Sequence, residues 1–238
     1  MRLDGAIFNI YNIDMERVKV VEIKEDITSR NNAQAQSIRD ELKRRGVFFL
    51  NVMSSPGSGK TTLIVNLINR LKKDFKIGVI EADIDSAVDA QTVSEVTGAK
   101  TVQIHTMGAC HLTCQMAYES LEALGIDGLD FVILENIGNL VCPAEFDTGA
   151  AANLVILSVP EGDDKPIKYP LMFEVADMVA ITKKDVLPAF DFSIEKATAN
   201  INMRNKNTPV FFVSAVSGEG VDELAEYLKR KAMKIKEA

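Results

Sequence analysis

The sequence contains no tryptophan, only three cysteines and two histidines, and aromatic residues make up 6% of its 238 residues. No apolar run approaches the about 20 residues that a transmembrane helix requires, so we expect no membrane span. The N-terminus lacks a basic segment followed by an apolar one, so we expect no signal peptide. We therefore expect a cytoplasmic protein, whose few thiols bind a metal or undergo redox reactions instead of forming permanent disulfides.

Basic residues are also fewer than acidic ones. Lys and Arg number 27 against 34 Asp and Glu, which gives a formal net charge of −7. An acidic chain is repelled by nucleic acids and by anionic membranes, so we expect neither as a partner. Internal repeats and Pro/Gly/Ser-rich linkers are absent as well, which predicts a single domain over residues 30–238. Residues 1–29 are predicted to form an N-terminal arm, to which we assign no function.

Short apolar segments of strand length alternate with amphipathic helical patterns. Strands are predicted at residues 47–53, 76–82, 100–105, 129–135, 153–159, 177–182 and 209–215. Helices are predicted at residues 30–45, 61–73, 110–124 and 221–236. This alternation is typical of an α/β fold, in which helices cover both faces of a mostly parallel sheet. Ligands of such sheets bind beyond the carboxyl ends of the strands.

A phosphate-binding loop follows the first predicted strand. The segment SSPGSGKTT, residues 54–62, matches the P-loop pattern at Gly59, Lys60 and Thr61, although Ser54 replaces the leading glycine. Backbone N–H groups of such a loop and the start of the next helix bind phosphate oxygens. We expect Lys60 to reach the β- and γ-phosphates and the Thr61 hydroxyl to bind Mg²⁺. The predicted phosphate-binding residues are Pro56, Gly57, Ser58, Gly59, Lys60, Thr61 and Thr62.

Two carboxylates at the ends of predicted strands complete the expected catalytic site. Asp83 follows the apolar segment at 76–82, and Glu135 ends the segment at 129–135. Because Mg²⁺ prefers oxygen ligands, we predict that Thr61, Asp83 and Glu135 bind it, directly or through water. We predict that Lys60, Asp83 and Glu135 are the catalytic groups. Between Asp83 and Asp147 the only basic residue is Lys100, so no arginine finger is available there and hydrolysis should be slow.

Later motifs favour guanine as the base. GTPases commonly carry Asn-Lys-x-Asp after a late strand, and this chain has Lys183 and Asp185, with Thr182 in place of the asparagine. Ser214 and Ala215 match the Ser-Ala turn that contacts guanine O6. The two motifs together predict GTP as the nucleotide. An ATP-dependent small-molecule kinase with the same P-loop is the alternative.

Every cysteine and histidine lies between residues 105 and 142. Cys110 and His111 open the helical pattern at 110–124, and Cys142 follows Glu135 by seven residues. Thiolate and imidazole suit zinc, nickel or copper better than Mg²⁺. Other interpretations are a buried thiol beside a capping histidine, or a redox pair of Cys110 with Cys114 or Cys142. Cys114, four residues after Cys110 on the predicted helix, is either a further ligand or a core residue.

Four segments carry a resemblance to a known family: SSPGSGKTT, GACHL, ENIGNLVCP and SVPEGDDKPIKYP. The chain resembles the hydrogenase nickel-incorporation GTPases, the HypB family of hydrogenase maturation factors. The resemblance covers roughly residues 30–230. It implies a SIMIBI-like P-loop GTPase that hydrolyses GTP to GDP and phosphate and inserts nickel into a hydrogenase precursor. It also implies that Cys110, His111 and Cys142 bind Ni²⁺ or Zn²⁺.

The resemblance further implies a homodimer promoted by GTP and metal. The implied partners are the hydrogenase large-subunit precursor and a companion nickel chaperone. The first 104 residues contain no Cys and no His, so the N-terminal nickel-binding and histidine-rich motifs of many relatives are absent. The related urease nickel GTPases are the nearest alternative. They carry a Cys-Pro-x-His motif, whereas Glu145 stands at the histidine position here.

Overall fold

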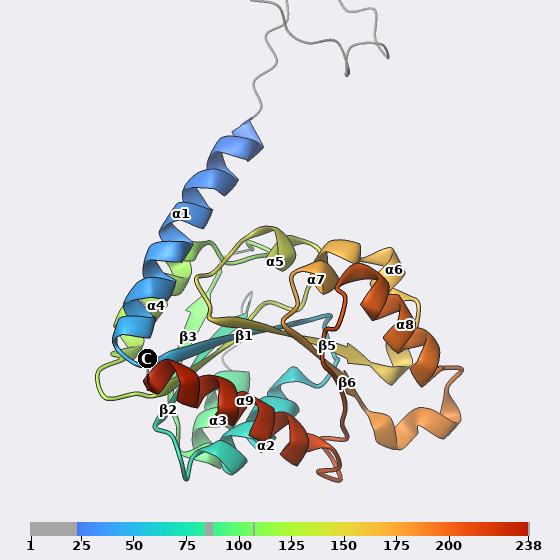
Figure 1. The fold of residues 1–238 in the computed structure, drawn as a ribbon. Coiled ribbons are helices and arrows are strands. Elements are labelled where there is room, and N and C mark those ends of the chain that lie inside the picture. The colour runs from blue at the N-terminus through green and yellow to red at the C-terminus, as the bar shows by residue number, and fades with distance from the viewer. Residues whose placement is uncertain (1–22, 84–87, 107, 238) are drawn as a thin grey trace, which may run out of the picture.

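A computed structural model of the chain describes residues 23–83, 88–106 and 108–237, without the side chains of residues 23–28, 83, 88 and 89 (Figure 1). The described strands form one seven-stranded sheet in which all pairs are parallel, in the order β3-β2-β4-β1-β5-β6-β7. The strands are β1 (Phe48–Ser54), β2 (Ile77–Asp83), β3 (Lys100–His105), β4 (Phe131–Glu135), β5 (Ala152–Ser158), β6 (Met178–Thr182) and β7 (Val210–Phe212).

All seven predicted strands are confirmed. The central strand β1 is buried along its whole length, which explains why its sequence, FFLNVMS, is almost entirely apolar. Strand β7 is shorter than the predicted 209–215 because the chain leaves the sheet before Ser214 and turns back, with the Gly218 N–H donating to the Ser214 carbonyl. The edge strand β3 is only partly buried, in keeping with its mixed sequence, KTVQIH.

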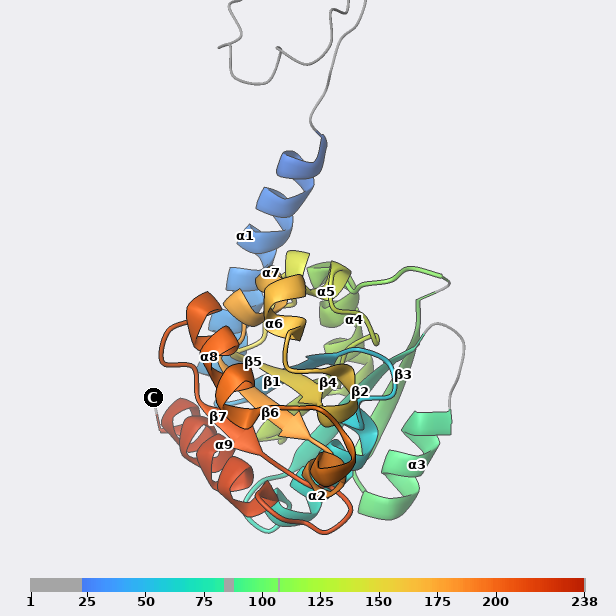
Figure 2. The ribbon, with the colours of Figure 1, turned by 90° about the vertical axis from the view of Figure 1, so that its right-hand side faces the viewer.

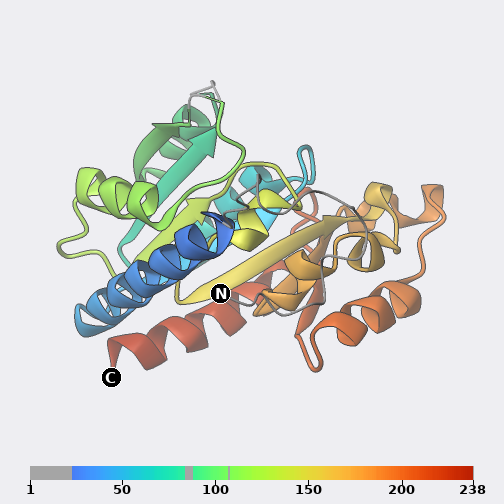
Figure 3. The ribbon, with the colours of Figure 1, turned by 90° about the horizontal axis from the view of Figure 1, so that it is seen from above.

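Helices cover both faces of the sheet. On one face, α2 (Lys60–Leu71) and α9 (Val221–Lys236) pack against the side chains of Phe48, Leu50 and Val52. On the other face, α1 (Ile23–Arg44) and α4 (Cys114–Leu124) pack over Phe49, and α1 lies beside α4 in the view from above (Figure 3). The alternation along β1 therefore divides the core between the two faces. The predicted α/β fold with helices on both faces is confirmed.

The remaining helices are short or peripheral. They are α3 (Val88–Thr97), α5 (Cys142–Glu145), α6 (Lys165–Lys168), α7 (Pro170–Glu174), α8 (Ile194–Arg204) and the 3₁₀ turns η1 (Val159–Glu161) and η2 (Lys184–Ala189). No helix in the described part of the chain is long and apolar enough to cross a bilayer.

Two predicted helix boundaries are wrong. Helix α1 begins at Ile23 instead of residue 30, so the described end of the predicted arm is helical. The N-terminal part of α1 projects away from the body of the protein (Figure 2). The rest of the arm, residues 1–22, lies outside the described residues. Helix α4 begins at Cys114 instead of residue 110, because the Thr113 hydroxyl accepts a hydrogen bond from the Met116 N–H and caps the helix there.

Candidate nucleotide and metal site

The P-loop joins β1 to α2 in the predicted order. Gly57 and Gly59 have φ angles of 71° and 90°, in the left-handed region that favours glycine. Gly59 is the residue before α2, so the loop ends with backbone N–H groups at a helix N-terminus. Lys60 and Thr61 are the first two residues of that helix. The loop therefore has the backbone shape that binds phosphate.

Ser54 fits the position where the P-loop pattern has a glycine. It is the last residue of β1, in extended backbone, and its side chain is fully buried. Its hydroxyl donates to the Ser55 carbonyl and accepts a bond of 2.6 Å from the Ser58 hydroxyl. The serine therefore braces the loop from inside. The Ser58 side chain consequently points inward, away from the cavity that the other loop residues line.

A cavity of about 500 Å³ lies beside the P-loop, at the carboxyl ends of β2, β4 and β1. Lys60, Thr61 and Glu135 line it, as does Thr62. The Thr61 hydroxyl donates a hydrogen bond of 2.9 Å to Glu135 Oε1, so two predicted Mg²⁺ ligands lie within contact of each other. Asp83 lies at the end of β2, opposite His105 of β3, but its side chain is outside the described set.

The predicted guanine-recognition loop touches the P-loop directly. The Thr182 hydroxyl donates a hydrogen bond of 2.7 Å to the Ser58 carbonyl, and Lys183 Nζ donates one of 2.7 Å to the Gly57 carbonyl. Thr182 is 1% exposed, so this bond is made in the interior. The threonine at the asparagine position therefore ties the two nucleotide loops together.

Asp185 and the Ser-Ala turn also meet. The Ser214 hydroxyl donates a hydrogen bond of 2.6 Å to Asp185 Oδ1, across 29 residues of sequence. The Ala215 carbonyl accepts a bond of 3.0 Å from Asn66 Nδ2 on the helix that follows the P-loop. Four residues are predicted to contact the base: Lys183, Asp185, Ser214 and Ala215. Each of them thus contacts the P-loop, the helix that follows it, or another of the four. None of them lines the cavity at the carboxylates.

The predicted metal ligands lie in the loop before α4 and at the start of α5, which approach each other. Cys110 Sγ is 2.9 Å from Cys142 Sγ, although the residues are 32 positions apart. The His111 ring stacks on Phe146, with centroids 3.9 Å apart, and its Nδ1 is 3.8 Å from Cys110 Sγ. Within the described chain, no three His, Cys, Asp or Glu side chains are grouped closely enough to hold a metal ion. One chain therefore supplies a sulfur pair, with an imidazole nearby.

Burial and neighbouring groups affect the pKa values of the predicted metal ligands and of Cys114 differently. Burial lowers the pKa of His111, against a smaller opposing effect of Glu145, and so favours the neutral imidazole. The pKa of Cys142 is raised, chiefly by the hydrogen bond that it shares with Cys110. Cys114 is fully buried, and burial raises its pKa to about 11. Cys114 is thus a core residue, and because Cys110 precedes α4, the expected shared helix face does not exist.

One side chain links the nucleotide loop to the sulfur pair. The Asn139 N–H donates a hydrogen bond of 2.8 Å to the carbonyl of Ser54 in the P-loop. The Asn139 side-chain oxygen accepts bonds from the N–H groups of Val141 and Cys142, at 2.8 and 3.4 Å. Asn139 therefore connects the Ser54 carbonyl to the backbone N–H of Cys142.

Comparison with known proteins agrees with this geometry. Residues 48–212 match the family model described as the CobW/HypB/UreG nucleotide-binding domain. The hydrogenase maturation factor HypB of Rhizobium leguminosarum is 43% identical over 92% of this chain and 73% of its own length. The chain belongs to the HypB family. The hydrogenase/urease maturation factor HypB of Helicobacter hepaticus is 40% identical over 90% of this chain and 88% of its own length.

A solved HypB structure has the same fold. The crystal structure of HypB from Helicobacter pylori in complex with nickel matches with a TM-score of 0.81 and 38% identity. The match covers 86% of this chain and 96% of that one. The chain therefore has the architecture of a P-loop GTPase, and it is similar over most of its length to hydrogenase maturation factors.

Two residues that line the cavity beside the P-loop were not predicted from the sequence. Glu81 is 3% exposed, lines the cavity and lies opposite Glu135 in the register of β2 and β4. Gln103 of β3 lines the same cavity, and its buried Oε1 has no hydrogen-bond partner among the described residues. A charged residue inside the apolar strand VIEAD was the signal for Glu81, because a buried carboxylate is retained only where it has a partner or a function.

Proposed function

We propose that this chain is a GTP-hydrolysing metallochaperone that delivers nickel to a hydrogenase precursor. The observation that carries the proposal is the Cys110–Cys142 sulfur pair, 2.9 Å apart. Its Cys142 lies three residues after Asn139, whose N–H is hydrogen-bonded to the P-loop. A nucleotide site and a soft-metal site thus share one loop. Membership of the HypB family and the nickel-bound relative support the assignment.

The nucleotide is held at both ends by residues of this chain. The P-loop N–H groups and Lys60 bind the phosphates, and Asp185 accepts hydrogen bonds from guanine N1 and N2 while Lys183 packs over the ring. The hydroxyl of Ser214 already orients Asp185. Thr61, Glu135 and Asp83 bind Mg²⁺, and the contact between the Thr61 hydroxyl and Glu135 fits a cation that prefers oxygen ligands. When bound, Mg²⁺ neutralises charge on the β- and γ-phosphates.

Hydrolysis is slow in this proposal. Lys60 is the only cationic side chain among the described residues that line the cavity, so charge that develops on the γ-phosphate meets a single lysine. Lys165, in the EGDDKP segment, does not line the cavity, and its Nζ lies 5.2 Å from the centre of the Tyr169 ring. Intrinsic GTPases without a supplied arginine turn over far below about 1 s⁻¹.

The metal site is completed by a second copy of the chain. Cys110, His111 and Cys142 offer at most three ligands per chain, whereas zinc and nickel sites in proteins usually have about four. Two copies related by a two-fold axis present six such groups at one self-complementary surface. GTP orders the P-loop, and through Asn139 it also orders the loop of Cys142. We therefore propose a homodimer that GTP and Ni²⁺ or Zn²⁺ promote, with hydrolysis releasing the metal.

The enzyme that receives the metal is the second part of the proposal. The partners are a hydrogenase large-subunit precursor and a companion nickel chaperone. One relative is named for both hydrogenase and urease, so urease is the alternative recipient. The absence of a histidine at Glu145 favours hydrogenase.

The experiment that tests the function uses one purified sample of the full chain. Metal content, GTP turnover and mass in solution are measured with GDP and with a non-hydrolysable GTP analogue, with and without Ni²⁺ or Zn²⁺. We expect slow GTP turnover, no ATP turnover, and a dimer that appears with the GTP analogue and metal. A chain that remains monomeric under all conditions, or one that hydrolyses ATP as well as GTP, contradicts the proposal.

A further inference from the structure

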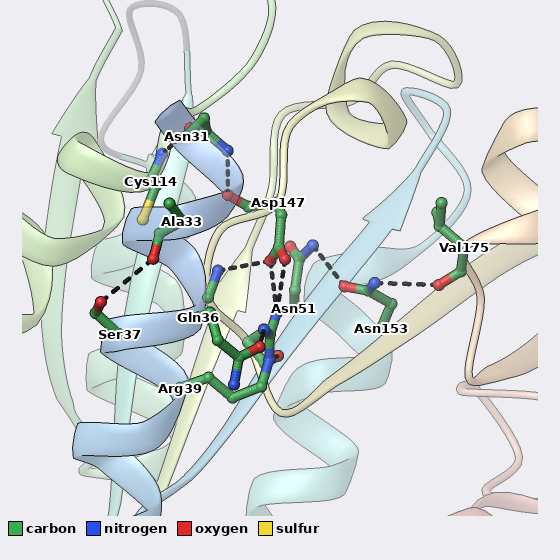
Figure 4. Close-up of polar contacts among 12 residues, drawn as sticks. Asn31, Ala33, Gln36, Ser37, Arg39, Asn51, Cys114, Asp147, Asn153 and Val175 are labelled. Carbon is green, nitrogen blue, oxygen red and sulfur yellow. Dashed lines mark hydrogen bonds and ion pairs between the residues drawn. The ribbon is translucent and has the colours of Figure 1, made fainter. Parts of the chain in front are cut away.

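Helix α1 contacts two segments that adjoin those of the sulfur pair, through the side chain of one buried asparagine. Asn31 is 8% exposed and lies on the face of α1 that meets α4 (Figure 4). Its Oδ1 accepts a hydrogen bond of 2.8 Å from the Cys114 N–H, and its Nδ2 donates one of 2.8 Å to the Asp147 carbonyl. One amide therefore joins two segments that are 33 residues apart in sequence.

Both segments lie close in sequence to a cysteine of the pair. Cys114 is the first residue of α4, four residues after Cys110, and Asp147 follows Cys142 by five residues. The N–H of the first helical residue has no partner within its own helix, so Asn31 satisfies a donor that the fold otherwise leaves open. Together with the Thr113 cap, the bond holds the start of α4, where the loop of Cys110 joins the helix.

A second contact from α1 holds the other segment. The Arg39 guanidinium binds both carboxylate oxygens of Asp147 at 2.7 Å and donates from Nε to the Ala150 carbonyl at 2.9 Å (Figure 4). The Asp147 carboxylate also accepts a bond of 2.8 Å from the Gly149 N–H. A Cβ atom at Gly149 would lie 3.0 Å from the Ala35 carbonyl oxygen, so this segment packs directly on the α1 backbone. Arg39 anchors it, and Asn31 links it to α4.

We infer that Asn31 is a positioning residue for the metal site, which sets the separation of Cys110 and Cys142 from the far side of the two loops. Asn31 itself does not touch the metal. This inference rests on the proposed metal site, and it adds that α1 controls the metal ligands while leaving the nucleotide loops alone. None of the hydrogen bonds of Asn31 or Arg39 involves a P-loop or guanine-loop residue. Outer residues that orient ligands in this way typically change metal affinity by about 10- to 100-fold when removed.

The test compares Asn31→Ala and Asn31→Asp with wild-type full-length protein. The aspartate keeps an acceptor for the Cys114 N–H and loses the donor to Asp147. Asn205→Ala is the matched control, since Asn205 Nδ2 also joins two backbone carbonyls, those of Glu174 and Ala176 at 3.1 and 2.8 Å, far along the sequence from the sulfur pair. Ni²⁺ affinity is measured by anaerobic competition with a chromophoric chelator, and GDP affinity is measured in parallel.

A second measurement needs no metal. Diamide takes two electrons and two protons from a pair of thiols, so that one S–S bond forms and the diazene becomes a hydrazine. The rate of the Cys110–Cys142 crosslink reports the distance between the two sulfurs, and Cys114 does not compete because it is buried. We expect both Asn31 variants to bind Ni²⁺ about tenfold more weakly and to crosslink several-fold more slowly. GDP affinity should change by less than about twofold, and Asn205→Ala should match the wild type in every measurement.

The outcomes separate the two proposals. If folded Asn31 variants bind Ni²⁺ and crosslink as the wild type does, the positioning role is wrong. If Cys110→Ala still binds stoichiometric Ni²⁺, the proposed metal site is wrong. The crosslinking rate of the Asn31 variants then still tests whether Asn31 positions the two sulfurs. If Asn31→Ala does not fold, Asn31→Asp decides the question, because it retains one of the two hydrogen bonds.

Discussion

The hydroxyl of Thr182 donates a 2.7 Å hydrogen bond to the backbone carbonyl of Ser58, 124 residues earlier in the chain. This bond joins the strand that leads to the guanine-recognition loop to the centre of the P-loop. The predicted base-recognition loop and the P-loop are therefore connected directly, and we expect Thr182 to contribute to the affinity for any nucleotide that uses both loops.

Thr182→Val tests this connection. Valine has nearly the same shape but leaves the buried Ser58 carbonyl without this donor, at a cost of about 1 kcal/mol or more. We expect GTP and GDP to bind about 5- to 10-fold more weakly, as measured by titration with fluorescent nucleotides. Thr198→Val is the matched control, because the Thr198 hydroxyl donates to the Ile194 carbonyl within α8. Equal affinities for Thr182→Val and wild type would remove the threonine from the nucleotide site.

Lys60→Ala should remove most of the phosphate affinity. Hydrogen bonds to charged groups contribute about 1.5–3 kcal/mol, and no other lysine or arginine in the described part of the chain lines the cavity. We expect GTP binding to fall by about 100-fold while the circular dichroism spectrum and the unfolding midpoint stay unchanged. Lys72→Ala, an exposed lysine just after the same helix, should bind GTP normally.

Asp185→Asn should exchange the base preference. The carboxylate accepts two guanine donors, and an amide presents a donor of its own to them, so GTP should bind about 10- to 100-fold more weakly. Xanthine carries a carbonyl where guanine carries the amino group, so the same variant should bind XTP more tightly than wild type does. Competition between GTP and XTP measures both changes. A variant that still prefers GTP would disprove the role of Asp185 in base recognition.

Removal of either sulfur of the pair should abolish the metal site. Cys110→Ala and Cys142→Ala should each lose stoichiometric Ni²⁺ or Zn²⁺, as measured by metal analysis after gel filtration, and should no longer dimerise with metal. Cys114→Ala is the internal control. Cys114 is buried in the core with a pKa of about 11, so its loss should lower stability slightly and leave metal content unchanged. Metal loss in Cys114→Ala alone would reassign the ligands.

Asp163, in the EGDDKP segment, should make the stability of the fold depend on pH in the acid range. Its pKa lies below the ordinary value, chiefly because Lys196 Nζ donates to it at 2.8 Å, with a further bond from the Ser193 N–H. A depressed folded pKa means that the carboxylate stabilises the fold above its unfolded pKa of about 3.9, and that this contribution disappears as pH falls through the folded value.

Denaturant unfolding of wild type and Asp163→Asn between pH 7 and pH 3 measures this effect. The difference in unfolding free energy should be constant near neutrality and shrink below about pH 4. A difference that grows as pH falls would contradict the sign.

The amino-acid sequence by itself determined the fold class, the strands and the nucleotide loops. Phe48, Leu50 and Val52 alternate with Phe49 and Met53, so β1 could only be a strand buried on both faces. Gly57, Gly59 and Lys60 depend on local backbone geometry, which is encoded within a few residues. Local patterns of this kind are legible without knowledge of distant neighbours.

The tertiary structure decided everything that depends on residues far apart in sequence. The position of Cys114 in the core and the bridge from Asn31 to Cys114 and Asp147 depend on the packing of α1 against α4. The start of the helical pattern at 110–124 was misjudged, because Thr113 caps the helix and the Cys114 N–H donates to Asn31. A hydrogen bond across 83 or 116 residues leaves no local signature in the chain, because either partner is an ordinary polar residue until the fold brings the two together.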